Sequence, residues 1–544
     1  MMDLPFAVSL APASSRSNHT GTWRTDRPVY IDAWPPCNAA CPAGESVQGW
    51  LYHAAAGDWE IAWRQLVAVN PFPAVMGRVC YHPCEARCNR REFDEAVAIN
   101  AVEQFLGDEA LRRGWRLPSP GAPTGHRVLI VGAGPAGLAA AYHLRLLGHE
   151  VELHDAEAEP GGMMRYAIPT FRLSRRVLDA EIERVLELGI HYHPRSRISD
   201  LSAVSGYDAI FVAVGAQRPH RVQLPADPAA RILDALDLLR RTAQGERPGL
   251  GRRVAVYGGG NTAMDAARTA KRLGADEVVV VYRRTRERMP AHDTEVAEAV
   301  EEGVAFEWLS TVTHVEPGSL RLERMELDAA GKPRPTGRFV ARPADTLILA
   351  LGQEVDAGLL RALPGVRCAD GGVAVDASLM TGAAGVFAGG DMIPGERTVT
   401  AAIGHGRRAA LSIDAWLRGR QPPSEPLRES AAFASLNTWY YDESPAAQRN
   451  RLPRARRLGG FGEVVRGLDP AHALAEARRC FSCGNCFQCD NCYAVCPDAA
   501  VLKVESGHGY AIDLDYCKGC GLCVAECPVG AIRTVPEPGT EVDA

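Results

Sequence analysis

The chain has 544 residues, of which 46% are hydrophobic and 23% are charged, and its formal net charge at pH 7 is −6. This composition is typical of a large soluble enzyme with three or four domains, and the negative charge argues against nucleic acid or an anionic membrane as partner. No apolar run reaches the ~18 residues of a membrane-spanning helix, and the first ten residues lack a basic signal segment, so we expect a cytoplasmic protein.

Cysteines are concentrated near the two ends of the chain. Residues 1–35 are rich in Ser and Pro without a clear period, and a block of five thiols follows, at Cys37, Cys41, Cys80, Cys84 and Cys88. Clustered thiols in a reducing compartment indicate metal or iron–sulfur ligation. Spacings of four residues suit iron–sulfur clusters better than a zinc ribbon, whose pairs are usually C-x2-C, but zinc or buried structural thiols stay open as alternatives.

A glycine-rich turn follows a linker at 117–125. Four apolar residues at 128–131 predict a buried strand, and the turn after it contains Gly132, Gly134, Pro135, Ala136 and Gly137. These glycines permit a tight turn, close approach of a pyrophosphate, and close packing of the next helix. A ligand-free turn is the alternative. The following strand ends at Asp155, about twenty residues later, where a carboxylate binds a ribose hydroxyl, and this favours a dinucleotide site.

A second nucleotide motif lies about 120 residues further on. Two glycine-containing segments precede it, one with Gly162 and Arg165 and one ending at Gly215. The motif itself is G-x-G-x-x-A, formed by Gly258, Gly260, Asn261, Thr262 and Ala263. The next strand ends at Arg283 and Arg284 instead of an acid, which favours the 2′-phosphate of NADP(H) over NAD(H). Alternatively, these arginines only solvate the end of the strand, and NAD(H) stays open.

The chain then returns to strand–glycine patterns that end at Gly352 and at Gly390-Asp391, before a helical pattern over 400–417. This order is expected when one nucleotide-binding domain is inserted in another. The predicted fold class is therefore α/β, with two doubly wound domains.

The C-terminal block repeats C-x2-C-x2-C-x3-C-P twice, at Cys486, Cys489, Cys492 and Cys496, and again at Cys517, Cys520, Cys523 and Cys527. This repeat is typical of bacterial two-cluster ferredoxins, in which the fourth cysteine of each run ligates the other cluster. A zinc module is the disfavoured alternative. From Cys480 onward there are nine Asp and Glu against three Lys and Arg, so we expect this domain to dock on a basic surface.

An ordered set of motifs resembles the glutamate synthase small-subunit family, which includes the N-terminal half of dihydropyrimidine dehydrogenase and the flavin subunit of ferredoxin:NADP transhydrogenase. The matching segments are Asn70-Pro-Phe-Pro, Gly77-Arg-Val-Cys80, the 132–137 turn, Gly162-Met-Met-Arg-Tyr-Ala-Ile-Pro169, Phe171-Arg-Leu173, the motif at 258–265, Val281-Tyr-Arg-Arg-Thr-Arg286, Met289-Pro-Ala291 and Gly389-Gly-Asp391. The resemblance implies FAD at the first site, with Asp155 on its adenosine ribose and Asp391 near its ribityl or phosphate part. It implies a nicotinamide nucleotide at the second site and [4Fe-4S] clusters in a helical N-terminal domain.

The resemblance also implies ligands for the N-terminal clusters. The inner cluster corresponds to Cys41, Cys80, Cys84 and Glu103, whereas the outer cluster lacks a C-x2-C pair, because no cysteine precedes Cys37. The sequence Glu476-Ala-Arg-Arg-Cys-Phe-Ser-Cys483 resembles the missing pair, so our hypothesis is that Cys480 and Cys483 complete a cluster with Cys37 and Cys88. Four clusters then use fifteen cysteines and leave Cys368 free. If Cys480 and Cys483 are spare thiols, three clusters are left.

We expect six segments: a helical iron–sulfur domain (1–120), the first part of an FAD domain (121–217), an NAD(P) domain (218–345), the second FAD part (346–416), a connector (417–479) and a ferredoxin-like domain (480–544). Nicotinamide transfers a hydride and a cluster accepts single electrons, so a flavin must lie between them. The expected function is electron transfer between NAD(P)H and a ferredoxin, or a partner subunit such as a 2-oxoacid:ferredoxin oxidoreductase, within a hetero-oligomeric complex. The alternatives are a glutamate synthase small subunit that delivers NADPH electrons to a large subunit, and a non-catalytic wiring subunit. No proton-transfer residue is assigned.

Overall fold

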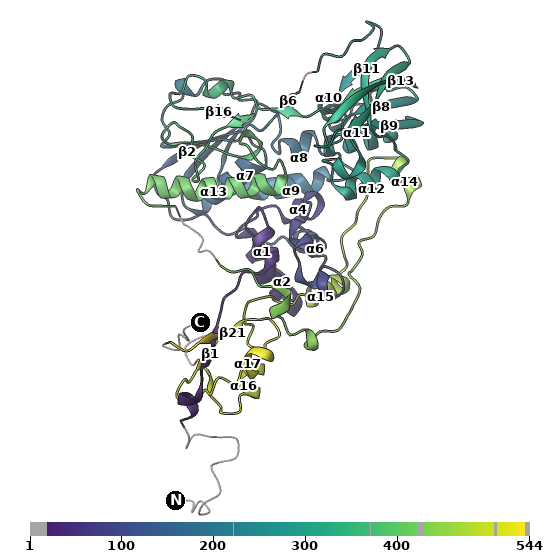
Figure 1. Ribbon diagram of the computed structural model, residues 1–544. Coiled ribbons are helices and arrows are strands. Elements are labelled where there is room, and N and C mark those ends of the chain that lie inside the picture. Colours follow the sequence, from purple (N-terminus) through teal and green to yellow (C-terminus); the bar gives the residue numbers. More distant parts are fainter. Residues whose placement is uncertain (1–18, 221, 370, 423–427, 505–508, 539–544) are drawn as a thin grey trace, which may run out of the picture.

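The computed structural model describes residues 19–220, 222–369, 371–422, 428–504 and 509–538, so the Ser/Pro-rich residues 1–18 lie outside it (Figure 1). Two α/β units lie next to each other, with a helical unit and a small C-terminal unit below them in this view. Among the described residues, no helix has both the length and the hydropathy that crossing a membrane requires.

The N-terminal unit is a helical domain. Its helices are α1 (Pro36–Ala40), α2 (Val47–Ala56), α3 (Trp59–Val67), α4 (Pro73–Val79), α5 (Pro83–Ala86) and α6 (Ile99–Arg113). Trp50 and Trp63 are fully buried between them. Helix α15 (Pro470–Arg478), from the expected connector, packs against α2 and α6 and buries Ala473 and Ala477 in the same core. The connector therefore supplies part of this domain.

The first sheet is parallel, in the order β18-β5-β2-β3-β4. Its strands are β2 (Arg127–Val131), β3 (Glu150–His154), β4 (His191–His193), β5 (Ala209–Val212) and β18 (Val386–Ala388). Helices α7 (Pro135–Leu146) and α13 (Val399–Leu417) pack against each other beside it, and α8 (Met163–Tyr166) and α9 (Arg175–Leu186) follow β3 in the chain. Residues 128–131 are buried, as a strand covered on both faces requires.

The second sheet is also parallel, in the order β10-β9-β8-β14-β7. Its strands are β7 (Ile232–Asp234), β8 (Arg253–Tyr257), β9 (Glu277–Val281), β10 (Ala305–Glu307) and β14 (Thr346–Leu349), with helices α10 (Ala235–Ala243), α11 (Asn261–Arg272) and α12 (Asp293–Glu301). An antiparallel sheet of β11 (Ser310–Glu316), β12 (Ser319–Leu327) and β13 (Pro333–Pro343) lies between β10 and β14 in the chain. Short pairs are formed by β6 (Arg218–Pro219) with β15 (Gln353–Glu354) and by β16 (Cys368–Ala369) with β17 (Gly372–Val373).

The fold class is confirmed, since two doubly wound α/β units occur and the second lies within the chain of the first. One boundary is corrected. Strand β14 pairs in parallel with β8 and β7, so it belongs to the second sheet, although the sequence placed 346–416 in the first domain. A short, continuously apolar strand fits the centre of either parallel sheet, and its pattern does not identify its neighbours.

The small C-terminal unit contains α16 (Asn491–Val495), α17 (Leu522–Ala525) and the hairpin of β19 (Val501–Lys503) with β20 (Tyr510–Ile512). Its last strand, β21 (Ile532–Pro536), pairs antiparallel with β1 (Asp26–Tyr30) from near the other end of the chain (Figure 1). Strand β1 therefore belongs with the C-terminal unit and not with the helical domain expected at 1–120.

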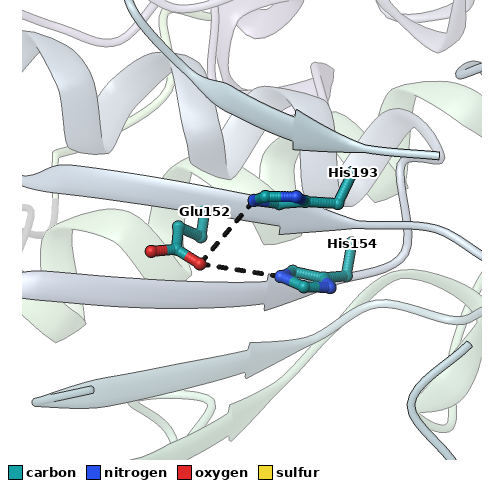
Figure 2. A group of neighbouring side chains, drawn as sticks. All are labelled: Glu152, His154 and His193. Carbon is teal, nitrogen blue, oxygen red and sulfur yellow. Dashed lines mark ion pairs between the residues drawn. The ribbon is translucent and has the colours of Figure 1, made fainter. Parts of the chain in front are cut away.

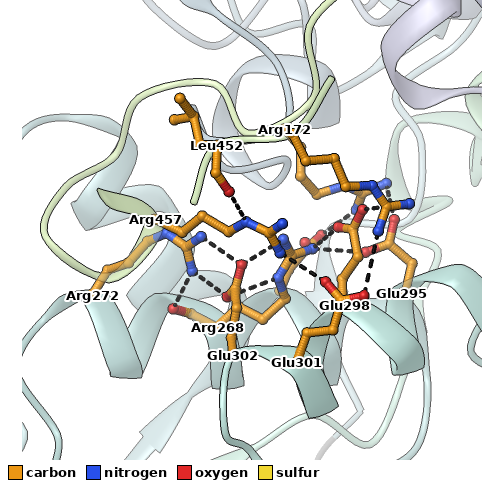
Figure 3. Close-up of polar contacts among 11 residues, drawn as sticks. Arg172, Arg268, Arg272, Glu295, Glu298, Glu301, Glu302, Leu452 and Arg457 are labelled. Carbon is orange, nitrogen blue, oxygen red and sulfur yellow. Dashed lines mark hydrogen bonds and ion pairs between the residues drawn. The ribbon is translucent and has the colours of Figure 1, made fainter. Parts of the chain in front are cut away.

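A buried ion-pair network joins the second α/β unit to the rest of the molecule (Figure 3). Arg268 on α11 is fully buried and pairs with Glu298 at 2.7 Å and with Glu302 at 3.0 Å. Arg172, from the segment after α8, reaches Glu295 at 2.6 Å. Arg457, on helix α14 (Arg454–Leu458) of the connector, pairs with Glu301 at 2.8 Å. The network thus fixes α11 and α12 against two other parts of the chain.

Candidate functional site

The first glycine turn connects β2 to α7. Gly132 has φ +106°, and a Cβ there would lie 2.5 Å from the Ala213 carbonyl oxygen. A Cβ on Gly137 would lie 1.9 Å from the Gly132 oxygen, so both positions require glycine. Over Gly134 the nearest atom to such a Cβ is 4.0 Å away, which leaves room next to the N-terminus of α7. A helix N-terminus with free space in front of it is suited to a phosphate.

Asp155 lies directly after β3 and faces this turn. Its carboxylate accepts hydrogen bonds from the N–H groups of Ala133 at 2.6 Å and Glu157 at 2.7 Å. Burial raises the pKa of Asp155, although these two N–H groups oppose the shift. The carboxylate is therefore held at the strand end next to the glycine turn.

The second glycine segment packs on the first. The Gly161 N–H donates to the Ala133 carbonyl at 2.8 Å, and a Cβ on Gly162 would lie 2.8 Å from the Gly134 Cα. Arg165 is buried, and its guanidinium donates to the Pro160 carbonyl and pairs with Glu159 and Asp179. These contacts of Arg165 hold the second glycine segment in place.

The remaining expected residues of the first site lie after β5 and β18. Gly215 has φ +71° beyond the end of β5. Gly390 has φ +68°, and a Cβ there would approach the Ala136 side chain to 3.0 Å. Burial raises the pKa of Asp391 to about 6. Ala136, which follows Pro135 in the first turn of α7, therefore lies close to Gly390.

Helix α13 connects this region to the N-terminal cysteines. Thr398 caps the helix by accepting from the Ala401 N–H at 3.1 Å. In the first turn, the Thr400 hydroxyl donates to Cys80 Sγ at 3.2 Å. Sequence reasoning did not select Thr400, because nothing in its local sequence indicates a contact with a residue 320 positions away.

The second nucleotide motif connects β8 to α11. Gly258 has φ +145°, and a Cβ there would lie 2.1 Å from the Ala350 carbonyl oxygen, whereas the space at Gly260 is open. Asn261 Oδ1 accepts from the His292 N–H at 2.9 Å. The other expected residues here are Thr262 and the buried Ala263 in α11, and Gly352, which follows β14 with φ +111°.

Arg283 and Arg284 lie two and three residues beyond the end of β9. Arg283 is exposed and Arg284 is half-buried. Neither guanidinium forms an ion pair with any residue in the described part of the chain. Both cations are therefore available to an anionic ligand at this strand end.

The inner set of expected metal ligands is buried in the helical domain. The thiols of Cys80 and Cys84 interact electrostatically with each other, and burial followed by the Glu103 carboxylate raises the pKa of Cys80 to about 12. The Cys41 thiol also interacts electrostatically with Cys80. A second carboxyl group, that of Glu45, was not selected from the sequence. The Asn70 amide donates to Glu45 at 2.9 Å and to Glu103 at 3.0 Å. The only local signal for Glu45 is its position four residues after Cys41.

The outer set comes from both ends of the chain. Cys37, Cys88, Cys480 and Cys483 line one cavity. Burial raises the pKa of the Cys37 thiol, and the nearby thiols of Cys480, Cys88 and Cys483 add to this effect. The Ser482 N–H donates to Cys480 Sγ at 3.4 Å. Four converging thiols with a backbone donor suit a cubane iron–sulfur cluster.

The C-terminal thiols form two further sets. Cys496, Cys517, Cys520 and Cys523 line one cavity, and Cys486 and Cys492 each interact electrostatically with both Cys489 and Cys527. Each set thus combines three cysteines of one run with the fourth cysteine of the other. Cys368, on β16, is exposed and belongs to none of these sets.

Hydrogen bonds reach several of these sulfurs. The N–H groups of Ala500 and Ala531 donate to Cys496 Sγ and Cys527 Sγ at 3.2 and 3.3 Å, and the Tyr30 hydroxyl lies 3.2 Å from Cys492 Sγ. Donors of this kind stabilise cluster thiolates. The donor sets therefore fit [4Fe-4S] clusters.

Three parts of the chain match known protein families. Residues 126–406 match the pyridine nucleotide-disulphide oxidoreductase family. Residues 26–115 match domain II of dihydropyrimidine dehydrogenase, described as a 4Fe-4S cluster domain, and residues 510–533 match a 4Fe-4S binding domain.

Three relatives align over most of the chain. The beta subunit of the NADP(+)-dependent formate dehydrogenase of Moorella thermoacetica is 35% identical over 501 residues, covering 82% of this chain and 70% of that protein. The beta subunit of the NADPH-Fe(3+) oxidoreductase of Geobacter sulfurreducens is 33% identical over 515 residues, covering 84% and 76%. The small chain of the NADPH glutamate synthase of Azospirillum brasilense is 34% identical over 422 residues, covering 71% and 87%.

These matches agree with the glycine turns and the thiol sets, and they confirm the expected class of enzyme and its cofactor types. The chain combines an FAD- and NAD(P)-binding unit with [4Fe-4S]-binding domains, and it transfers electrons. It is an NAD(P)H-dependent iron–sulfur flavoprotein oxidoreductase, and it belongs to the pyridine nucleotide-disulphide oxidoreductase family, in the group that contains the glutamate synthase small chain.

Proposed function

We propose that this chain exchanges a hydride between NADP(H) and FAD and passes single electrons through four [4Fe-4S] clusters to or from a protein partner. The observation that carries the proposal is the cavity lined by Cys37, Cys88, Cys480 and Cys483. A cluster held there joins the helical domain to the ferredoxin-like domain and makes one electron path out of two separate groups of clusters.

The first glycine turn binds FAD in this proposal. The N-terminus of α7, with the open space over Gly134, receives the pyrophosphate, and Asp155 accepts from the adenosine ribose. Asp391 lies at the ribityl or phosphate part. Bound FAD supplies the conversion between two-electron and one-electron transfer.

The second glycine turn binds the nicotinamide nucleotide. Gly260 leaves the N-terminus of α11 open, and Arg283 and Arg284 supply positive charge where the 2′-phosphate of NADP(H) is expected. Because no carboxylate neutralises these two arginines among the described residues, they favour NADP(H) over NAD(H).

The inner cluster is held by Cys41, Cys80, Cys84 and Glu103, and it is the first cluster after the flavin. The contact between Thr400 and Cys80 supports this order, because α13 begins eight residues after Asp391.

The outer thiols come next. Cys84 interacts electrostatically with Cys37, which supports a step from the inner to the outer set. Tyr441 interacts with Cys480 and Cys483 and also with Cys489 and Cys527, so the outer set is near the ferredoxin-like domain.

The partner is a ferredoxin or a catalytic oxidoreductase subunit, such as a 2-oxoacid:ferredoxin oxidoreductase, in a cytoplasmic hetero-oligomeric complex. Two relatives are named as beta subunits, which supports a role as one subunit of a larger enzyme. The exposed thiols Cys486, Cys489 and Cys520 support electron exchange with a partner at the ferredoxin-like domain.

The double variant Cys480→Ser/Cys483→Ser tests the path, with Cys368→Ser as the matched control. We expect the double variant to lose about four irons per chain, as one [4Fe-4S] cluster contains. NADPH should still reduce its FAD, whereas NADPH-dependent reduction of an added ferredoxin should fall at least tenfold. Unchanged iron content in the double variant would contradict the proposal. Loss of FAD reduction together with iron would indicate general misfolding, which circular dichroism checks.

A further inference from the structure

Three side chains outside both nucleotide sites and all thiol sets converge at the edge of the first sheet (Figure 2). Glu152 and His154 are alternate residues of β3, so they point to the same face of the sheet. His193 lies on the edge strand β4, directly paired with His154. The register of two strands therefore places one carboxylate and two imidazoles together.

The ligand atoms are close enough for one metal ion. Glu152 Oε2 is 3.7 Å from His154 Nε2 and 3.7 Å from His193 Nε2, and the three ligand atoms lie within 4.8 Å of one another. A tetrahedral Zn²⁺ with bonds of ~2.0–2.1 Å separates its ligand atoms by roughly 3.3 Å. Side-chain rotation must bring the ligand atoms closer when the ion binds, and the two imidazole rings already lie next to each other, with centroids 4.3 Å apart.

His154 is oriented for metal binding. Its Nδ1 lies 2.8 Å from the Ser196 hydroxyl, which fixes the ring. Its Nε2 is buried and forms no hydrogen bond with any described residue. A buried nitrogen without a hydrogen bond is rare in folded proteins, and this one faces His193 and the Glu152 carboxylate, with which it has only a long ion-pair contact of 3.7 Å. In metal-binding histidines one ring nitrogen usually has a hydrogen-bond partner that fixes the ring while the other nitrogen binds the metal, and the Ser196 hydroxyl is such a partner here.

Glu152 is also held by its neighbours. Arg127 donates to Oε1 at 2.7 Å, and the Tyr207 hydroxyl donates to Oε2 at 2.5 Å. These contacts keep the carboxylate ionised and fixed, and one lone pair of Oε2 is left for a metal. The positive charge of Arg127 opposes cation binding, so the affinity must come from the two imidazoles, which select Zn²⁺ over Ca²⁺ or Mg²⁺.

We propose that Glu152, His154 and His193 bind a divalent transition-metal ion, for which Zn²⁺ is the best fit, with water as the remaining ligand. The ion would tie β4 to β3 at the residue before Asp155. The Asp155 N–H donates to the His193 carbonyl at 3.1 Å, and the Ser196 N–H donates to the Asp155 carbonyl at 2.7 Å. The metal would therefore stabilise the backbone that positions Asp155, and this second consequence rests on the proposed FAD site.

Calorimetric titration of the full chain with Zn²⁺ alone tests the site. The protein carries its FAD and clusters and is first dialysed against a chelator. The variant is His193→Ala, and His191→Ala, an exposed residue on the same strand outside the three-residue group, is the matched control. We expect the wild type and His191→Ala to bind one Zn²⁺ ion at this site with the same affinity. In His193→Ala the affinity for this ion should be at least tenfold lower. Any Zn²⁺ bound by cysteines is common to all three proteins. Indistinguishable titrations of the wild type and His193→Ala would overturn the proposal.

The rate of FAD release on dilution, with and without Zn²⁺, tests the link to Asp155. Zn²⁺ should slow FAD release from the wild type at least threefold. It should not change the rate of FAD release from His193→Ala. If Zn²⁺ binding depends on His193 but FAD release does not respond, the link to Asp155 is overturned and the metal site stands. If the purified chain holds no FAD, the proposed function fails, while the Zn²⁺ titration still decides the metal site.

Discussion

Arg283 and Arg284 are the individual residues on which the choice of nucleotide depends in our proposal. We expect Arg283→Ala/Arg284→Ala to raise KM for NADPH about 10- to 100-fold, because charge-assisted hydrogen bonds contribute ~1.5–3 kcal/mol. KM for NADH should change less than about twofold. Steady-state dye reduction with both nucleotides measures this.

The matched control for this pair is Arg252→Ala. Arg252 precedes β8 at the opposite end of the second sheet, where its side chain is exposed and pairs with Asp276. The Arg252→Ala substitution should leave the KM values for NADPH and NADH unchanged. Equal increases in KM for NADPH and NADH in the double variant would show that the arginines do not bind the 2′-phosphate.

Tyr30 offers a second test at the scale of one residue. Its hydroxyl lies 3.2 Å from Cys492 Sγ and would donate to a cluster thiolate, which favours the reduced, more negative cluster. Removing a hydrogen bond of ~0.5–1.5 kcal/mol with Tyr30→Phe should lower the potential of one cluster by about 20–60 mV. An anaerobic redox titration followed by EPR measures the shift. Tyr493→Phe, an exposed residue next to Cys492 in the chain, is the control, and equal potentials in both variants would contradict the role of the hydroxyl.

Among single residues, the sequence identified those whose chemistry depends on their own type and spacing. Gly132 and Gly258 have backbone conformations that other residues rarely adopt, and the cysteine runs have fixed spacings. Thr400, Tyr30 and Glu45 could not be found in this way. Each acts through a contact between distant segments, and threonine, tyrosine and glutamate are common in many other roles.

Among the elements, α11 and α12 depend most on buried charge. Arg268 lies at the centre of the network in Figure 3, and three glutamates of α12 and its C-terminal end surround it. We expect Arg268→Met to destabilise the protein by about 3–5 kcal/mol, because it leaves buried carboxylates without their cation. The apparent melting temperature followed by circular dichroism measures this loss.

Arg451→Met is the control for this element. Arg451 belongs to the connector, is partly exposed, and reaches Glu298 and Glu301 only at 3.8 and 3.6 Å. A partly exposed pair of this kind contributes ~0–1 kcal/mol, so its melting temperature should stay close to that of the wild type. Similar melting temperatures for both variants would mean that burial of the network does not determine its contribution.

The sequence predicted the type of most elements and failed on the neighbours of some. The apolar strands before each glycine turn were found, because continuous apolar runs bounded by glycine are typical of buried parallel strands. The partners of β14 and β1 were assigned to the wrong units. Strand pairing is decided by contacts across the whole chain, and a strand of four or five residues contains no information about a partner far away in the sequence.

At the scale of the whole molecule, the acidic C-terminal domain should make partner docking depend on salt. We expect NADPH-dependent reduction of a basic one-electron acceptor protein, such as cytochrome c, to slow about tenfold as ionic strength rises from ~0.02 to ~0.5 M. Reduction of the bound FAD by NADPH in the same buffers should change much less, because that step needs no protein partner. Stopped-flow absorbance separates the two steps, and equal salt responses would contradict docking through the acidic domain.

The sequence allowed an order of domains to be predicted, because each expected domain contains a motif with a physical reason for its residues. The way in which the two ends of the chain meet was available only as a hypothesis about Cys480 and Cys483. Cysteine spacing limits which thiols share a local turn, but it does not determine which distant turns face each other. That information came from the packing of α15 on α2 and from the pairing of β1 with β21.

The cavity formed by Cys37, Cys88, Cys480 and Cys483 has a consequence for biosynthesis. Cys88 leaves the ribosome long before Cys480, and at ~5–20 residues per second the delay is roughly 20–80 s. During this time the helical domain carries only half of the thiols of that cavity. Assembly of a cluster there must wait until translation has passed Cys483, so a product truncated before that point would have the nucleotide-binding units but no complete path for electrons between the two ends.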